Sequence, residues 1–247
     1  MVLWQTVIPS EVAAGGRVER SNSLVRSLRA SRRWRYLVGM TIFVIAIFSF
    51  SVSAAAPAQR VLLPVPFQTQ APFANWTLPW KEACEEASII LTHAAVNHKN
   101  VTPHQMSQEI LKMVKYQEKN WGEHRDLTVK ETADLAQKVY NFKLEVKDKP
   151  SLEDLKQWLR DQRLVIVPTA GRLLKNPHFR RPGPVYHMVV LRGFDEAKKV
   201  FIVNDPGTQY GEGYKYSYPT LMNALHDWNG TDEAIEQGAK RVLVTKL

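Results

Sequence analysis

The 247 residues can hold one sizeable domain together with a tail or anchor, and 45% hydrophobic residues indicate a real core. The single cysteine, Cys84, excludes an internal disulfide. Residues 1–36 hold seven Arg and two Glu, so they carry +5 of the formal net charge of +9 and leave +4 for the other 211 residues. Because those residues contain no dense Lys/Arg stripe interleaved with aromatics, we expect no nucleic-acid partner.

The N-terminal sequence predicts a tail followed by a membrane or signal segment. Residues 1–36 lack sustained apolar periodicity and predict a basic cytoplasmic tail. Residues 37–56 contain no charge and are long enough to cross a bilayer as a helix. Five Arg residues precede this segment closely and only Arg60 follows it, so we expect the rest of the chain to be extracytoplasmic. The sequence Ser53-Ala54-Ala55-Ala56 also fits a signal-peptidase site, so the domain is expected to be either membrane-anchored through residues 37–56 or secreted.

The first half of the remaining chain predicts one strand and three helices. Residues 61–67 predict a short edge strand, because two prolines prevent pairing on both sides. Residues 83–96 predict a helix, which places Cys84 in its first turn. Apolar residues at helical spacing predict two further helices, at residues 103–119 and 128–140.

Next come a strand at residues 142–146 and a helix after Ser151, where S-L-E-D is a capping-box pattern. Residues 164–168 predict a short buried strand. The Pro- and Arg-rich stretch at residues 171–184 predicts no regular structure.

A hairpin is predicted from the apolar runs at residues 185–191 and 200–203. If its loop has an odd number of residues, His187 and Asp205 project from the same face, whereas an even loop would separate them. Such a carboxylate would orient the imidazole. Taken singly, each residue is better explained without catalysis: His187 as a hydrogen-bonded core residue and Asp205 as a turn residue before Pro206.

The C-terminal part predicts a helix at residues 218–228 and a closing strand at residues 241–247. The glycine-rich stretch at residues 207–213 lacks the Lys-Ser/Thr and helix of a phosphate-binding loop. No His or Cys spacing fits a metal site, so we expect neither a metal nor a cofactor.

Cys84 is the candidate nucleophile. Unpaired N–H groups and the helix dipole at a helix N-terminus favour thiolate over thiol. Glu85 and Glu86 oppose a neighbouring thiolate, so a cationic partner such as His⁺ would be needed to complete the activation. The alternative is a small buried cysteine that only packs at the start of the helix.

Four motifs, taken together, resemble the papain-like cysteine peptidases related to the bacteriocin-processing (double-glycine leader) peptidases. They are V-P-F-Q-T-Q-A-P, W-K-E-A-C-E-E-A-S, Y-H-M-V-V-L-R-G-F-D and V-N-D-P-G-T. The resemblance covers residues 61–247. It implies an α+β, papain-like peptidase domain, with an N-terminal helical part carrying the nucleophile helix and an antiparallel β-sheet, preceded here by one transmembrane or signal helix.

The resemblance also implies the site. Cys84 would be the nucleophile, His187 the general base, Asp205 the orienting carboxylate and Gln70 the oxyanion-hole donor. Gln68 stays open for the last role, because the spacing from Gln70 to the cysteine is long for this family. The implied activity is hydrolysis of peptide bonds in a peptide or protein substrate, and trimming of cell-wall peptides or transpeptidation would use the same chemistry. The alternative function is a catalytically silent, membrane-tethered peptide or cell-wall binding module on the same scaffold.

Overall fold

A computed structural model describes residues 59–246 of the chain. The expected basic tail (residues 1–36) and the expected membrane or signal segment (residues 37–56) lie outside the described residues. Within residues 59–246, no helix is both long enough and apolar enough to cross a bilayer.

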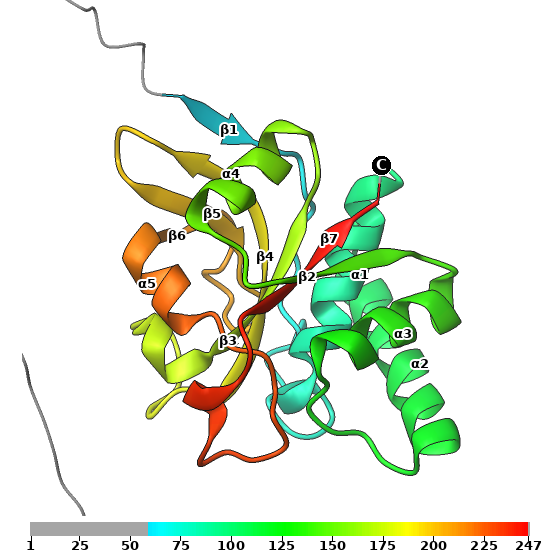
Figure 1. The fold of residues 1–247 in the computed structure, drawn as a ribbon. Coiled ribbons are helices and arrows are strands. Elements are labelled where there is room, and N and C mark those ends of the chain that lie inside the picture. The colour runs from blue at the N-terminus through cyan, green and yellow to red at the C-terminus, as the bar shows by residue number, and fades with distance from the viewer. Residues whose placement is uncertain (1–58, 247) are drawn as a thin grey trace, which may run out of the picture. The chain divides into compact units, whose positions relative to one another are not determined.

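An antiparallel β-sheet forms the centre of the domain (Figure 1). Its strands are β1 (Arg60–Leu62), β2 (Leu144–Asp148), β3 (Val165–Ala170), β4 (Tyr186–Asp195), β5 (Val200–Asn204), β6 (Tyr214–Ser217) and β7 (Arg241–Thr245). The order across the sheet is β2-β7-β3-β4-β5-β6, and β1 pairs with the far end of β4. The C-terminal strand β7 therefore lies between β2 and β3 inside the sheet.

The helices are α1 (Cys84–Val96), α2 (Pro103–Trp121), α3 (Val129–Tyr140), α4 (Leu152–Arg160) and α5 (Tyr218–Ala224), with short 3₁₀ turns η1 (Trp80–Glu82), η2 (Gly171–Leu174) and η3 (Ile235–Gln237). Figure 1 shows α1, α2 and α3 gathered on one side of the domain, with α5 on the other. Helices in one part and an antiparallel sheet in the other confirm the predicted α+β class.

Three of the helices begin at capping boxes. Thr102, Thr128 and Ser151 each accept a hydrogen bond from the backbone N–H three residues on, and the side chain at that position binds back to the capping residue. Each box satisfies two backbone donors that a helix start leaves unpaired. The box predicted at Ser151 is confirmed, with Asp154 as its reciprocal partner.

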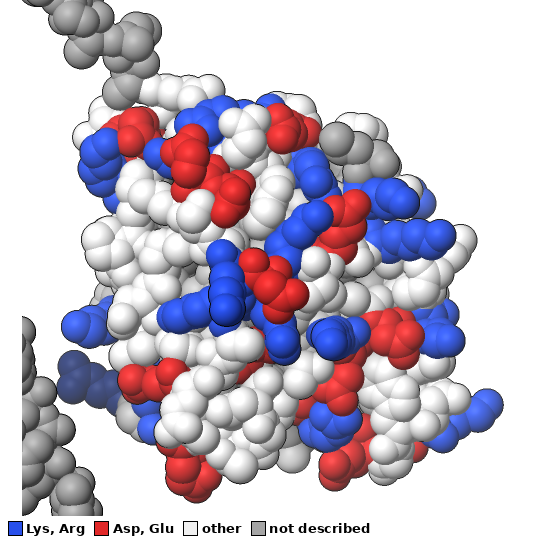
Figure 2. All heavy atoms as spheres, viewed as in Figure 1, with Lys and Arg blue, Asp and Glu red and all other residues white. Residues whose placement is uncertain are grey.

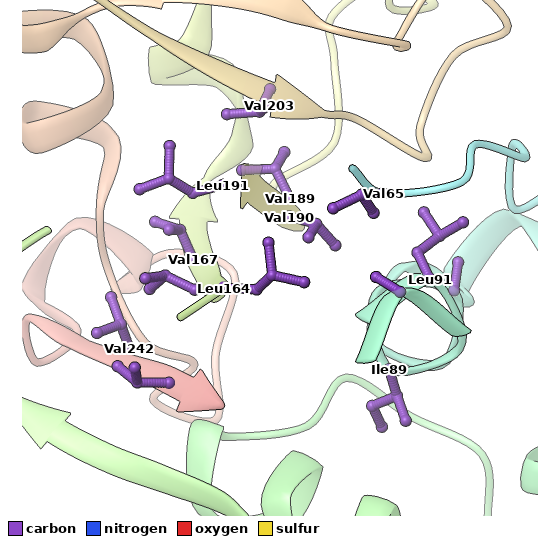
Figure 3. Packing of buried hydrophobic residues seen from close by; sticks show 14 of the residues in the cluster. Val65, Ile89, Leu91, Leu164, Val167, Val189, Val190, Leu191, Val203 and Val242 are labelled. Carbon is purple, nitrogen blue, oxygen red and sulfur yellow. The ribbon is translucent and has the colours of Figure 1, made fainter. Parts of the chain in front are cut away.

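The core is built from β-branched and Leu side chains of the central strands and of α1. Figure 3 shows Val189 and Val190 of β4 near Val65 of the N-terminal segment and Leu91 of α1. These four side chains are buried. Helix α1 is buried around its whole circumference from Cys84 to Thr92, including its polar residues. Its first turn is therefore fixed in position by packing on all sides.

Three expected elements are shorter in the structure, one of them the closing strand β7, which ends at Thr245. The first strand ends at Leu62 instead of Phe67, because Pro64 and Pro66 carry no N–H for a ladder. The last helix ends at Ala224 instead of Trp228. Beyond it, Leu225 forms an isolated bridge with Thr169 of β3.

Other differences concern unpredicted or displaced elements. The stretch expected to be irregular at residues 171–184 begins with the 3₁₀ turn η2, and the strand expected at residues 142–146 is displaced to Leu144–Asp148. Strand β6 was not predicted. Its four residues pair with β5 and form an edge strand of the sheet. These elements depend on pairing and packing partners that lie far away in the sequence.

Basic and acidic residues are interspersed over the face drawn in Figure 2. Lys and Arg side chains alternate there with Asp and Glu side chains, so this face carries no continuous basic stripe. The absence of a nucleic-acid partner stays a prediction.

Candidate active site

Cys84 is the first residue of α1 and is 4% exposed. Its thiol donates a hydrogen bond to Glu85 Oε2 at 3.0 Å. The backbone N–H of Met188, on β4, donates to Sγ at 3.3 Å. The thiol therefore lies between its own helix and the strand that carries His187.

The surroundings of the thiol favour its protonated form. Burial raises the pKa of Cys84 well above its usual value, and the charge of Glu85 and then that of Asp126 raise it further. The hydrogen bond from the Met188 N–H acts in the opposite direction. In this conformation the sulfur is consequently a thiol.

His187 and Asp205 form a buried pair. The imidazole Nε2 lies 2.7 Å from Asp205 Oδ1, and the side chains are 3% and 0% exposed. This contact occupies Nε2 and leaves Nδ1 as the nitrogen that can act on another group. The ring of Phe179 packs edge-on against the imidazole at 5.3 Å between centroids.

A β-bulge brings these two side chains to the same face of the sheet. The hairpin loop between the paired residues Asp195 and Val200 has four residues, an even number. An unbroken ladder would then place Asp205 opposite Val190, on the face that His187 does not share. The register shifts by one residue at Arg192, so that Val190 pairs with Asn204. For a loop with an even number of residues, the sequence predicted His187 and Asp205 on opposite faces of the sheet. The extra residue of the bulge brings them to the same face.

Asp205 is held by further hydrogen bonds. The hydroxyl of Tyr216 donates to its Oδ2 at 2.6 Å, Asn176 Nδ2 donates at 3.2 Å, and the Gly207 N–H donates to Oδ1 at 3.0 Å. Burial by itself would raise the pKa of Asp205. The charge of His187 and the hydrogen bonds from His187, Tyr216 and Gly207 outweigh burial, so the pKa lies below its usual value. Asp205 is therefore ionised at neutral pH.

Gly207 leaves room for the imidazole. A Cβ at this position would lie 2.7 Å from His187 Cε1 and 2.9 Å from Nε2. Real side chains do not approach so closely, so any other residue would displace the ring or the loop.

Asn204 faces away from His187 and has a structural role. Its Nδ2 donates to the carbonyl oxygens of Val65 and Pro66, and its Oδ1 accepts from Arg192 and from the Gly213 N–H. The residue thus ties the N-terminal segment to the bulge and to the loop before β6.

Gln70 anchors the turn before the cysteine. Its Nε2 donates to the carbonyl oxygens of Trp80 and Lys81 in η1 at 2.9 and 3.0 Å, while its buried Oε1 has no partner among the described residues. Its backbone N–H donates to Pro206 O at 2.9 Å, next to Asp205. Gln70 therefore connects the turn that precedes Cys84 with the loop that follows Asp205. Gln68 lies half-buried in the same segment.

The four residues expected to form the site thus come from segments that touch one another. Within residues 59–246, however, no hydrogen bond joins Sγ of Cys84 to the imidazole of His187, because Sγ is engaged by Glu85 and Met188. The described residues also contain no group of three His, Cys, Asp or Glu arranged to hold a metal ion.

Sequence reasoning missed several partners in the site. No sequence pattern marked Tyr216 or Asn176 as a partner of Asp205. Their contacts arise only when strand β6 and the loop that carries Asn176 pack beside Asp205 in the fold. Glu85 was considered only as a charge opposing a thiolate, whereas in the structure it also accepts hydrogen bonds from the Cys84 thiol and, at 2.9 Å, from the N–H of Leu127. That double contact links α1 to the loop between α2 and α3.

Comparison with known proteins bears on the family and the fold. Residues 62–235 match the model of the peptidase C39-like family. A Bacillus anthracis protein described as a C39-like peptidase has a similar structure, with 16% identity and a TM-score of 0.50 over 76% of this chain and 98% of that chain, which supports the fold. Xylellain, a cysteine protease from Xylella fastidiosa, gives 14% identity and a TM-score of 0.35 over 78% and 88% of the two chains, a likeness too low to carry an argument. A search of curated proteins found no match.

Proposed function

The chain belongs to the peptidase C39-like family and is a cysteine-type peptidase, and we propose that Cys84, His187 and Asp205 are its catalytic triad. The observation that carries the proposal is the buried contact of 2.7 Å between His187 Nε2 and Asp205 Oδ1. A carboxylate on one ring nitrogen fixes the tautomer and directs the other nitrogen, Nδ1, to a nucleophile.

Catalysis requires the thiol to leave its resting contacts. Rotation about the Cα–Cβ bond of Cys84 would release Sγ from Glu85 and the Met188 N–H, and catalysis needs a position of Sγ in which it meets Nδ1 of His187. An imidazolium beside the sulfur then stabilises the thiolate, which the present surroundings disfavour. The reactive species is therefore a second conformation of the same side chain.

The chemistry follows from these roles. The thiolate attacks the carbonyl carbon of the scissile amide, and the C–N bond breaks as His187 passes its proton to the leaving amine. Water, deprotonated by His187, then attacks the thioester and releases the acid and Cys84. Asp205 stays ionised throughout and stabilises the imidazolium.

Gln70 is proposed as the side-chain donor of the oxyanion hole, together with the Cys84 backbone N–H. In the resting arrangement both hydrogens of its Nε2 point to η1 carbonyl oxygens, so one of these contacts must be exchanged for the oxyanion. One oxyanion-hole donor typically contributes about 10²–10³-fold to turnover. Gln70→Ala should lose that factor with little change in thiol reactivity, and Gln68→Ala should lose less. The reverse ranking would assign the role to Gln68.

The peptidase domain is proposed to act outside the cytoplasm, tethered by residues 37–56 or released after Ala56. Support comes from the sequence: the segment is uncharged and the arginines cluster on its N-terminal side. Protease added to intact cells should digest the domain. Full protection of residues 61–247 would contradict this topology.

The triad is tested by combining turnover with alkylation. Cys84→Ala and His187→Ala should both abolish cleavage of a defined peptide mixture, as followed by mass spectrometry. His187→Ala should also slow alkylation of Cys84 by iodoacetamide near neutral pH, because the thiolate loses its cationic partner. An unchanged pH–alkylation profile would show that no thiolate–imidazolium pair forms. Absence of any cleavage by the wild type would favour the binding-module alternative.

A further inference from the structure

A cavity of about 1230 Å³ opens beside the start of α1. Part of its wall is apolar: Leu78 precedes η1, Leu111 and Val114 belong to α2, and Trp228 follows α5. The cavity therefore lies among elements that surround the nucleophile helix.

Direct contacts connect the cavity to the candidate active site. Asp126 lines it, and the N–H of the next residue, Leu127, donates to Glu85, which also accepts the hydrogen bond from the Cys84 thiol. On the other side, Trp228 packs against Tyr186 with ring centroids 5.4 Å apart. Tyr186 is the strand neighbour of His187 and donates its hydroxyl to Leu127 O at 3.0 Å. The cavity is thus only one residue layer away from Cys84.

Negative charge dominates the rest of the wall. Five carboxylates line it: Glu82, Glu118, Glu123, Asp126 and Asp232. The lining Lys and Arg residues are Lys115 and Arg125, and Arg125 is engaged at 2.6 Å by Glu131, which lies outside the cavity wall. His124 also lines it, and its Nε2 faces the buried Glu86 at 3.2 Å. Lys81, which lies outside the wall, pairs with Glu82 at 2.8 Å, and Arg125 lies 3.9 Å from Glu123. The negative charge of the wall that has no ion-pair partner among the described residues therefore comes from Glu118, Asp126 and Asp232.

Asp126 differs from Glu118 and Asp232 in being partly buried, whereas the other two are exposed. Its side chain takes part in no hydrogen bond or ion pair with any residue of the described part of the chain. Burial, the largest cause, and the charges of Glu82, Asp232 and Glu86 together raise its pKa to about 7, while His124 acts in the opposite direction. A cation entering the cavity would supply the partner that this carboxylate lacks.

We propose that this cavity is a specificity subsite that takes a Lys or Arg side chain of the peptide substrate, close to the scissile bond. The inference rests on the proposed peptidase site and adds its substrate class. The fit has two parts: the apolar wall accommodates the methylene stem of such a side chain, and Asp126 with Asp232 receives its charged end. A carboxylate-bearing side chain would be repelled, and a purely apolar one would leave Asp126 without a partner.

The test is a synthetic peptide library in which one position is Lys, Arg, norleucine or citrulline, with all flanking positions varied. Norleucine keeps the four-carbon stem of Lys and citrulline keeps the length of Arg, but neither carries a charge. Cleavage sites mapped by mass spectrometry should fall within two residues of Lys or Arg. The kcat/KM for peptides with Lys or Arg should exceed that for the matched norleucine or citrulline peptides by about tenfold or more. Such a ratio is expected for a charge-assisted contact.

Variants distinguish the cavity from other sources of selectivity. The double variant Asp126→Asn/Asp232→Asn should bring the charged-to-neutral ratio close to one. Asp161→Asn, which removes an exposed carboxylate at the end of α4, should keep the wild-type ratio, because Asp161 binds only within its own helix end. A wild-type ratio near one, or a ratio that the double variant leaves unchanged, would overturn the proposal.

A binding measurement separates this inference from the proposed catalysis. Fluorescence polarisation of the same labelled peptides with Cys84→Ala requires no turnover. Tighter binding of the Lys and Arg peptides, lost in the double variant on this background, would support the subsite even if the wild type cleaved nothing and the proposed catalysis failed. Equal binding of charged and neutral peptides would refute the subsite while leaving the peptidase assignment untouched.

Discussion

Replacing Tyr216 by Phe tests how the carboxylate of Asp205 is stabilised. The substitution removes one hydroxyl that donates to Asp205 Oδ2 at 2.6 Å, and both side chains are almost fully buried, at 3% and 0% exposure. Burial and the Asp205 charge raise the pKa of Tyr216, so its hydroxyl remains a donor at any physiological pH. The same hydroxyl accepts a hydrogen bond from Asn176 Nδ2 at 2.8 Å, which the substitution also removes, whereas Asn176 keeps its contact of 3.2 Å with Asp205.

The magnitude follows from the charge on the acceptor. A hydrogen bond to a buried ionised group contributes roughly 1.5–3 kcal/mol, against about 0.5–1.5 kcal/mol for one between neutral groups. The free energy of unfolding should therefore fall by about 2 kcal/mol at pH 7. The pKa of Asp205 in the folded protein should rise relative to the wild type, because one of the hydrogen bonds that lower it is gone.

The pH dependence gives the sharper test. Because the folded-state pKa of Asp205 is lowered, the stability from its ionised form is present above the unfolded-state pKa. It is lost as the pH falls through the folded-state value. In Tyr216→Phe this loss should be complete at a higher pH than in the wild type, because the folded-state pKa of Asp205 is higher in the variant. The difference in stability between the two should shrink to about 1 kcal/mol or less once Asp205 is protonated in both.

The assay is urea unfolding followed by circular dichroism at several pH values between 7 and 3. Tyr214→Phe is the matched control, since Tyr214 packs on Tyr216 with ring centroids 4.8 Å apart, and no hydrogen bond is recorded between its hydroxyl and Asp205. A difference below about 0.5 kcal/mol at pH 7, or one that is the same at every pH, would refute the reasoning.

Three further predictions concern the neighbouring residues. Gly207→Ala should lower kcat/KM by about 100-fold, because the added Cβ would displace the imidazole of His187. Circular dichroism should show that the variant still folds. Unaltered turnover would mean that the loop moves and the imidazole stays in place. Asn204→Ala should reduce the free energy of unfolding by about 2–4 kcal/mol, because it leaves buried carbonyl and N–H groups without a partner, and a chemical denaturation curve within 0.5 kcal/mol of the wild type would contradict this. Asp205→Ala should reduce turnover strongly and Asp205→Asn less so, as measured by peptide cleavage; loss of activity in a folded Asn204→Ala protein, together with an active Asp205→Ala, would reverse the two roles.

The sequence by itself determined where most helices and strands lie and that the chemistry is that of a cysteine peptidase. The helix that begins at Cys84, the capping box at Ser151 and the two apolar runs that form β4 and β5 follow from propensity, spacing and cap residues close together in the chain. Such signals act over a few residues and can be recognised without any partner. Shorter or displaced elements, such as α5 and β2, had their ends set by contacts with distant segments.

Tertiary structure alone decided the geometry of the site. The hairpin loop is even and would separate His187 from Asp205, but the bulge at Arg192 restores the shared face, and nothing in the local sequence specified that extra residue. The orientation of the Cys84 thiol towards Glu85 and the Met188 N–H, and the support of Asp205 by Tyr216, likewise depend on strands that meet only in the folded chain. The physical reason is that strand register and side-chain contacts are set by pairing between segments far apart in sequence, whereas helix starts are set by neighbouring residues.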